Sequence, residues 1–337
     1  MSTIGGAFDE TILLNQRVKA EALMMDDRIR QQFIPQYDVI KAIKAAQTAQ
    51  IMQPLSLRKD VDTTLMWENF CDIKAENCAT DCTVGGDKSS TNVQDYSLSF
   101  CKEVGFSMSE DDFIDNEYDM NIPKALLKAD KEITEAFAQY AVARLEAFKG
   151  VNVLTTGKGT VAGTDTYIKP EYWTPSLVAY FNRVNIMNKF TAPIFLSGSN
   201  LYEQYIVAGA NAANADGKGD FKLWAGLQPY FDLFNIDTVN EDVLKSYLIS
   251  MGSVAMANKY YNPDVPETTF DFVRYTMPSN FLEGMKYDVF YNNACEGTTR
   301  KLKHNYTIRF KADILLNPAG CEQTNTGVLS FVCGTNS

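Results

Sequence analysis

Histidine is nearly missing from this chain of 337 residues, in which His304 is the only one. A metal site that uses several histidines is therefore excluded, and a Ser-His-Asp or Cys-His pair could draw on this residue alone. His304 stands beside Lys303 at the start of a strand-like segment, where a solvated or hydrogen-bonded surface histidine is the simpler interpretation. Most hydrolase and metalloenzyme designs are excluded with it.

Long apolar runs and an excess of basic residues are also missing. No stretch approaches the roughly 18 to 20 continuous apolar residues of a membrane helix, and the start "MSTIGGAFDETILLNQRVK" has no basic segment before an apolar run. We therefore expect a protein made in a cytoplasm, soluble and without a membrane partner. The net charge of -11 disfavours tight binding to phosphate backbones. A hydrophobic fraction of 45% excludes a disordered chain.

The cysteines do not form a regular framework. The chain has 7 of them, an odd number, and three lie close together in "CDIKAENCATDC". A structural zinc site needs two close pairs, and only Cys78 and Cys82 have that spacing, so Cys71 and Cys101 would have to meet across two strands. A four-cysteine zinc site, late disulfides and reduced structural thiols all stay open, with reduced thiols favoured. No Cys-x-x-Cys indicates a redox enzyme.

Three short segments partly match known functional motifs, but each lacks residues that its motif requires. In "TTGKGT", Lys158 is followed by Gly159 where a phosphate-binding loop requires Ser or Thr. "SLRK", Ser56 to Lys59, lacks the companion motifs of a Ser-Lys acylase. The acidic run "SEDDFIDNEYD" lacks the glycine of a helical calcium loop and is more typical of a solvated turn. We therefore expect no enzyme, no cofactor and no catalytic residue.

The first third of the chain predicts helices followed by a hairpin. Apolar residues at steps of three and four predict an amphipathic helix over 12–34 and a weaker one over 37–51, an arm that packs on another part of the protein. The segment "DYSLSFCKEVGF" alternates apolar and polar residues, which predicts a strand with one covered face. Its expected partner is "TTLMWENFCDI", joined through the turn residues of "VGGDKSSTN".

The clearest element is a long helix after residue 120. Asn121 can serve as its N-cap, Pro123 lies in its first turn and Gly150 follows its end. At about 1.5 Å per residue the helix would be roughly 40 Å long. One apolar stripe runs along it, formed by Ile122, Leu126, Ala129, Ile133, Phe137, Tyr140, Ala141, Leu145 and Phe148. It is therefore expected to be a spine to which other parts attach.

The remainder predicts a mixture of elements. We expect a helix from Thr174, a strand at "PIFLSG", a helix at "SNLYEQYIVAG" and a capped helix from Asn240, with Leu244, Leu248, Met251 and Ala255 on one face. The C-terminal part predicts an alternating strand over 306–314, a turn at 317–320 and a return strand. The fold class is α+β, with helices and strands segregated along the chain.

The order of these elements resembles that of the major capsid proteins of tailed bacteriophages, which have the HK97-like capsid fold. The resemblance covers most of the chain as an order of elements. It is carried by "YSLSFCKEVGFSMSEDDF" leading into "IPKALLKADKEITEAFAQYAVARLEAF", then "PIFLSGSNLYEQYIVAG" and the ending "FKADILLNPAGCEQTNTGVLSF". It implies an N-terminal arm over 1–61, an extended hairpin loop over 62–106, a peripheral domain over 107–189 with the spine helix 122–149, an axial domain over 190–290, and C-terminal strands over 291–337 returning to the peripheral domain.

The resemblance also implies a function: a self-assembling subunit of an icosahedral phage head that encloses double-stranded DNA. The partners would be further copies in hexamers and pentamers, scaffold, portal and decoration proteins, and DNA held non-specifically, in a virion assembled in the host cytoplasm. Since the sequence begins almost directly with the arm, a separate scaffold is expected. The alternatives are an encapsulin-like nanocompartment shell and another phage structural or surface-binding protein. The residues expected at subunit contacts are Trp67, Phe70, Tyr96, Leu98 and Phe100.

Overall fold

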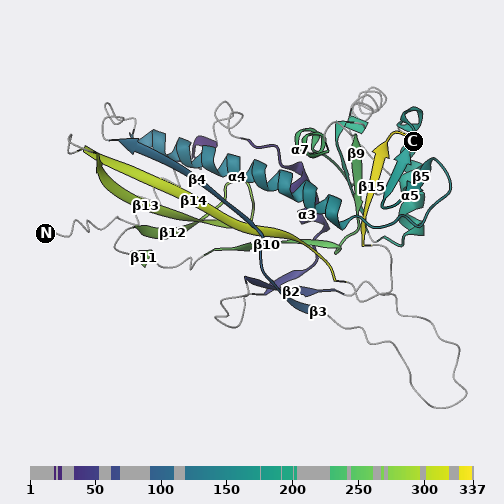
Figure 1. The fold of residues 1–337 in the computed structure, drawn as a ribbon, viewed down its shortest axis with the longest axis horizontal. Helices are drawn as coiled ribbons and strands as arrows, with labels where there is room; N and C mark the ends of the chain where they lie inside the picture. The colour runs from purple at the N-terminus through teal and green to yellow at the C-terminus, as the bar shows by residue number, and fades with distance from the viewer. Residues whose placement is uncertain are drawn as a thin grey trace, which may run out of the picture. The chain divides into compact units, whose positions relative to one another are not determined.

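The computed structural model describes most of the chain, and its helices and strands form two compact units. The described residues are 19, 22–24, 34–52, 62–68, 92–109, 118–174, 176–190, 192–199, 201–202, 228–240, 244–260, 267–268, 272–296, 301–318 and 326–335. The first unit combines Met1–Gln36, Leu98–Phe137 and Asn258–Ala312, and the second combines Tyr37–Ser97, Ala138–Ala257 and Asp313–Ser337. The expected α+β class is confirmed (Figure 1).

The described helices are few and the strands many. The helices are α3 (Asp38–Ala46), α4 (Tyr118–Phe148), α5 (Leu177–Met187), α7 (Leu233–Val239) and the short 3-10 helix η2 (Pro170–Tyr172). The strands are β1 (Gln50–Met52), β2 (Thr63–Trp67), β3 (Asn92–Tyr96), β4 (Phe100–Ser109), β5 (Gly159–Ala162), β6 (Asp165–Ile168), β7 (Ile194–Ser197), β8 (Gln228–Phe231), β9 (Lys245–Ile249), β10 (Val254–Lys259), β11 (Glu267–Thr268), β12 (Val273–Pro278), β13 (Lys286–Glu296), β14 (Lys301–Leu316) and β15 (Val328–Cys333). None of the described helices is long and apolar enough to cross a membrane.

The first unit packs part of α4 on a sheet. This sheet has the order β10-β14-β13-β12-β11, and β4 also pairs with β14. The ring of Phe137 in α4 lies 5.1 Å from that of Phe100 in β4 and 5.4 Å from that of Phe310 in β14. Figure 1 shows α4 running alongside these two strands. Buried and more exposed residues alternate along β4 and β14, so that one face of the sheet packs on the helix. The alternation of apolar and polar residues in their sequences predicts this pattern.

The second unit is built around a six-stranded sheet of the order β5-β6-β15-β9-β7-β8. Strand β15 runs parallel to β6 and antiparallel to β9. Helix α5 supplies the central core residue, Phe181, whose ring lies 4.8 Å from Phe195 in β7 and 4.9 Å from Phe331 in β15. All three side chains are fully buried. The sheet therefore has a dense aromatic core of its own.

Helix α3 packs on the strands β7 and β8 of this sheet, as expected for an arm with little core. Its buried face consists of Val39, Ile40, Ala42, Ile43 and Ala46. The carboxylate of Asp232, itself buried, accepts a hydrogen bond from the Val39 amide at 3.0 Å. The same carboxylate caps α7 by accepting from the Asn235 amide at 3.1 Å. One buried side chain thus joins two helices that are distant in sequence.

A third, smaller sheet in the second unit has the order β1-β2-β3. β2 pairs antiparallel with β3, with Thr63 opposite Tyr96 and Trp67 opposite Asn92. The sequence predicts that "DYSLSFCKEVGF" pairs with "TTLMWENFCDI", and the structure confirms this pairing only for Asp95 and Tyr96, which lie opposite Thr64 and Thr63. The continuation is different, because the strand is interrupted over 97–99 and β4 pairs with β14 in the first unit instead.

Two further expectations are wrong. The capped helix expected from Asn240 is absent, because α7 ends at Val239 and the chain then forms β9 and β10. The return strand β15 does not form a hairpin with β14 and lies between β6 and β9. In both cases the local sequence pattern is compatible with the expected element, but pairing with strands distant in sequence determines the structure that forms.

The long helix is found with different bounds, and the expected domain segments stay a prediction. α4 begins at Tyr118, before the expected 122–149, so Asn121 and Pro123 lie inside its first two turns and not at its cap. The compact units also interleave along the chain, so the segment 190–290 falls partly in each unit. Most of the helix expected over 12–34, and much of the helix-like "SNLYEQYIVAG", lie outside the described residues.

Candidate contact surface and polar network

The three-stranded sheet presents an unusually exposed strand. Within β3, four of the five residues are exposed and Tyr96 is half-buried. Val93 is 55% exposed, and Ile51 of β1 is 53% exposed. In the part of the chain that the structure describes, β3 pairs on one edge only, with β2. Exposed strand edges attract other strands, so this edge is a candidate contact surface.

The sheet nevertheless has a fixed internal structure. Trp67 is fully buried and donates from its indole nitrogen to the hydroxyl of Tyr96 at 2.9 Å, with the two rings edge to face at 6.4 Å. The Tyr96 hydroxyl in turn donates to Oε1 of Gln94 at 3.1 Å. Across the strands, the Thr64 hydroxyl donates to Asp95 at 2.7 Å. β3 is therefore held in register while its side chains remain accessible.

The residues expected at subunit contacts divide into three groups. Trp67, Leu98 and Phe100 have at most 5% of their surface exposed, so they belong to the interior of their own chain and have no surface for a neighbour. Tyr96 is half-buried beside the exposed part of β3, and contact with a neighbour stays a prediction for it. Phe70 lies outside the described residues. The exposed residues of β3 were missed because no apolar pattern marks them.

The cysteine cluster is described only in part. Cys101 is exposed in β4, opposite Lys311, while Cys71, Cys78 and Cys82 lie outside the described residues. Among the residues that are described, no group of three or more His, Cys, Asp or Glu side chains could hold a metal ion. The proposed four-cysteine site stays a prediction.

His304 has a defined neighbour. Its Nδ1 lies 2.8 Å from the hydroxyl of Tyr291, and the two rings are stacked at 5.9 Å. Lys158, from the phosphate-loop-like segment, donates to the hydroxyl of Ser176 at 3.1 Å and lies 5.9 Å from the ring of Tyr172. Ser56 and Lys59 lie outside the described residues. These contacts suit ordinary hydrogen-bonded side chains.

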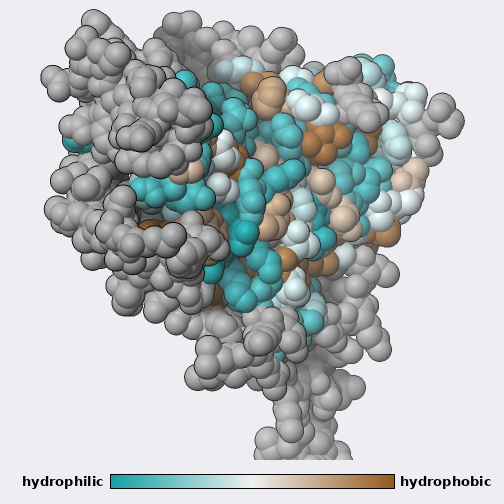
Figure 2. Space-filling model, turned by 60° about the vertical axis from the view of Figure 1, so that its left-hand side comes forward, coloured by the Kyte–Doolittle hydropathy of each residue, from teal (hydrophilic) through white to brown (hydrophobic). Residues whose placement is uncertain are grey.

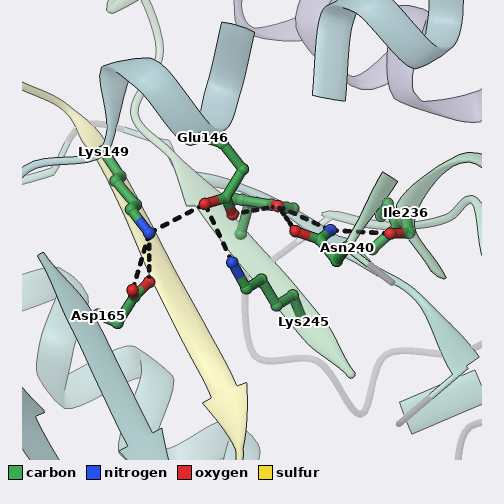
Figure 3. A network of polar contacts seen from close by, with 7 residues as sticks. Glu146, Lys149, Asp165, Ile236, Asn240 and Lys245 are labelled. Carbon is green, nitrogen blue, oxygen red and sulfur yellow. Dashed lines mark hydrogen bonds and ion pairs between the residues drawn. The ribbon is translucent and has the colours of Figure 1, made fainter. Parts of the chain in front are cut away.

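A cluster of charged and polar side chains surrounds Glu146, near the end of α4 (Figure 3). The Tyr247 hydroxyl donates to Oε1 of Glu146 at 2.5 Å, and the ammonium groups of Lys149 and Lys245 lie 2.9 and 3.0 Å from Oε2. Lys149 also donates to both oxygens of Asp165, at 2.7 and 2.8 Å. The network therefore joins the end of α4 to β6 and β9.

The protonation states in this network favour a structural role. Burial raises the pKa of Glu146, but the hydrogen bonds from Tyr247, Lys149 and Lys245 outweigh it and lower the pKa overall. Burial lowers the pKa of Lys149, but Asp165 and Glu146 outweigh it and raise the pKa. A lysine nucleophile needs a neutral amine. Lys149 instead stays an ammonium ion, and the cluster is a set of ion pairs that fixes the helix end.

A second carboxylate on α4, Asp130, has the opposite environment. It is fully buried in the first unit and accepts hydrogen bonds from the Ser279 hydroxyl at 2.7 Å and from the backbone and side chain of Asn280 at 2.7 and 3.1 Å. Burial outweighs these neutral donors and raises its pKa to about 6. Asp130 thereby holds the turn between β12 and β13 against the helix.

The surface drawn in Figure 2 carries no broad apolar area among its coloured residues. Hydrophobic residues, in brown, are scattered among hydrophilic ones, in teal. Scattered apolar residues are normal on protein surfaces. On the face drawn here, apolar side chains among the coloured residues therefore do not mark a contact surface.

Comparisons with known proteins find a resemblance in structure and none in sequence. No protein-family model and no curated protein matches the chain. A structure from Mycobacterium phage Bobi shares 15% identity at a TM-score of 0.44, covering 88% of this chain and 91% of that one. The capsid of Ralstonia phage GP4 shares 11% identity at 0.38, covering 82% and 84%.

The holo-SrpI encapsulin complex from Synechococcus elongatus PCC 7942 is also similar, with 13% identity, a TM-score of 0.38, and coverage of 77% of this chain and 81% of that one. The structural comparison thus returns phage structures, among them phage capsids, which agrees with the resemblance in the order of predicted elements.

Proposed function

We propose that this chain is a self-assembling structural subunit of an icosahedral phage head. The observation that carries the proposal is the exposed edge strand β3, which is paired on one side only within the described residues. A monomeric protein usually protects such an edge with proline, a bulge or a covering loop. β3 lacks proline and exposes Val93. An edge of this kind suits a chain whose other copies supply the missing contacts.

The other sheet of the second unit supports the assignment of the subunit contact to the sheet that contains β3. Its six-stranded sheet has a complete aromatic core and does not need another chain for stability. The small sheet buries Leu65 and Trp67 on one side and leaves β3 in solvent. Small isolated sheets are marginally stable in water and gain stability by packing on a partner. We therefore assign the subunit contact to the small sheet.

The proposed function implies a set of partners. Copies of the chain would associate as hexamers and pentamers, assembled in the host cytoplasm and found in the virion, with scaffold, portal and decoration proteins as further partners. Double-stranded DNA would be enclosed without tight binding, because the net charge of -11 opposes contact with phosphate groups. The proposed segments are the arm 1–61, the loop 62–106 and the peripheral and axial domains.

The test is direct. The purified chain, at high concentration and with polyethylene glycol to favour association, would be studied by analytical sedimentation and electron microscopy. Closed particles with hexamers and pentamers are expected, and a monomer under all of these conditions would contradict the proposal. Analysis of particle contents from the native source then separates a virion, which holds DNA, from a nanocompartment, which holds protein cargo.

A further inference from the structure

Strand β4 in the first unit has an outer edge that the described part of the chain does not use. β4 pairs antiparallel with β14, and among the described strands it pairs with no other. Its exposed residues are Cys101, Lys102, Glu103, Gly105 and Ser107. The amide and carbonyl groups along this edge can therefore accept a further strand. This edge is distinct from that of β3.

Gly105, in the middle of this edge, is not explained by the fold of its own chain. Its backbone is not in the left-handed region. A Cβ atom at this position would lie 3.6 Å from Oγ1 of Thr307 and 3.6 Å from the carbonyl oxygen of Tyr306, both ordinary contact distances. Glycine weakens a strand relative to alanine because it loses more conformational freedom on folding. In strands it commonly marks the close approach of another backbone.

The residues on either side of Gly105 suit pairing of β4 with itself. Val104 and Phe106 lie on the same face and are half-buried, with the ring of Phe106 stacked at 5.1 Å on that of Tyr306. Suppose that two β4 strands pair antiparallel with Gly105 at the centre. Val104 of each copy then lies opposite Phe106 of the other copy. Directly opposite apolar residues stabilise a pair of strands. The pairing therefore covers side chains that one copy leaves half in solvent.

The charged residues of β4 disfavour two other registers and are compatible with this one. With Gly105 at the centre, Glu103 lies opposite Ser107 of the second copy and Lys102 lies opposite Met108. A centre at residue 102 or 103 would instead place two lysines or two glutamates opposite each other, which is destabilising. A centre at Gly105 brings no like charges together.

We propose that two copies of this chain pair antiparallel through their β4 edges, with the two-fold axis at Gly105. The contact is the same patch on both copies, so the two sheets continue into one another. This inference rests on the proposed function in that it names one contact of the assembly.

A cysteine on the axis tests this register. In Gly105→Cys, the two substituted residues face each other with Cα atoms about 4.5 to 5.5 Å apart, within reach of a disulfide. Ser107→Cys is the matched control on the same strand, because its two copies would lie about 14 Å apart at 3.4 Å per residue. Native Cys101 is farther still, about 27 Å from its own copy on the same spacing.

A second variant keeps the glycine, in case Gly105→Cys disturbs folding. In Ser109→Cys, the substituted position lies opposite native Cys101 of the second copy in this register. Mass spectrometry of digested particles distinguishes a link between Cys101 and the thiol introduced at position 109 from links among the other cysteines. The unsubstituted chain is the control for background oxidation.

We expect mild oxidation of assembled particles to link most subunits in Gly105→Cys and Ser109→Cys, and essentially none in Ser107→Cys. Assembled particles without these links would overturn the β4 contact and leave the proposed function standing. Failure of the unsubstituted chain to associate under any of the assembly conditions above would instead contradict both.

Discussion

The two sheets of the second unit differ in how far each one buries its strands. In the six-stranded sheet, β7 is buried along its whole length and β9 along all but its first residue. In the three-stranded sheet, β2 buries alternate side chains, and β3 is exposed along most of its length. The first sheet has a buried core of its own, whereas the second leaves exposed the edge strand that we propose another copy covers. Within the second unit, we therefore expect the six-stranded sheet to determine the free energy of unfolding and the three-stranded sheet to form the proposed subunit contact.

The largest expected effect is in the core of the six-stranded sheet. Phe181→Ala removes a fully buried ring that contacts Phe195 and Phe331, and we expect the free energy of unfolding to fall by about 3–5 kcal/mol. Denaturant unfolding of the unassembled subunit measures this change. A loss below about 1 kcal/mol would contradict the view that this sheet carries the stability of the unit.

A smaller loss is expected at the entry to β15. Gly327 has a φ of +83°, and a Cβ atom there would lie 2.5 Å from Cβ of Ser253. Gly327→Ala should therefore cost about 2–4 kcal/mol from backbone strain and overpacking, measured by thermal unfolding.

The control is Gly163→Ala, at a φ of +63° with open space around it. Gly163→Ala should lower the free energy of unfolding by about 1–2 kcal/mol, which is the cost of placing an L-amino acid in the left-handed backbone conformation. Equal losses at the two glycines would show that the contact with Ser253 does not matter.

The polar network beside the six-stranded sheet predicts a pH-dependent effect. The pKa of Glu146 is lowered in the folded protein from its usual value of 4.5, so its stabilisation is present above that pH and is lost as the pH falls through the folded pKa. Glu146→Gln should cost about 1–2 kcal/mol at neutral pH, because hydrogen bonds to a charged acceptor are replaced by weaker ones.

The difference between the two proteins should shrink in acid, where the carboxylate of the unsubstituted chain is protonated. Unfolding in denaturant at several pH values measures it. A difference that stays constant from neutral pH to below 4.5 would mean that ion pairing is not what Glu146 contributes.

The smallest effect on the subunit itself is expected in the three-stranded sheet. Val93→Lys changes a side chain that is 55% exposed, so the free energy of unfolding should change by less than about 0.5 kcal/mol. Assembly should nevertheless be lost, since the lysine places a charge in the proposed contact. Val153→Lys, at a valine that is 51% exposed outside any strand, controls for the added charge. Unchanged assembly of Val93→Lys would remove β3 from the contact.

The elements that the sequence predicts well are those with strong local patterns. The long apolar stripe predicted α4 to within four residues at its start, although Asn121 was misjudged as a cap, since the helix begins at Tyr118. Alternation predicted β4 and β14, whereas the pairing predicted for β2 is correct only at Asp95 and Tyr96 of β3. These patterns lie within a few residues of one another and depend little on the rest of the chain.

The elements that it predicts badly depend on distant partners. Leu244, Leu248 and Met251 are spaced as on a helix, but a buried strand is apolar on both faces and can show the same spacing. These residues lie in and around β9, which pairs with β15 about 80 positions later. The network around Glu146 joins residues up to 101 positions apart, and no local motif marks it.

The central claim is that the three-stranded sheet is completed by another copy of the chain, and amide hydrogen exchange tests it most directly. Exchange would be compared between free subunits and assembled particles, for β3 and for β7 and β9. We predict that the amides of residues 92–96 that point away from β2 exchange rapidly in the free subunit and become protected on assembly, while β7 and β9 are protected in both states. Equal protection of β3 in free and assembled chains would contradict the account.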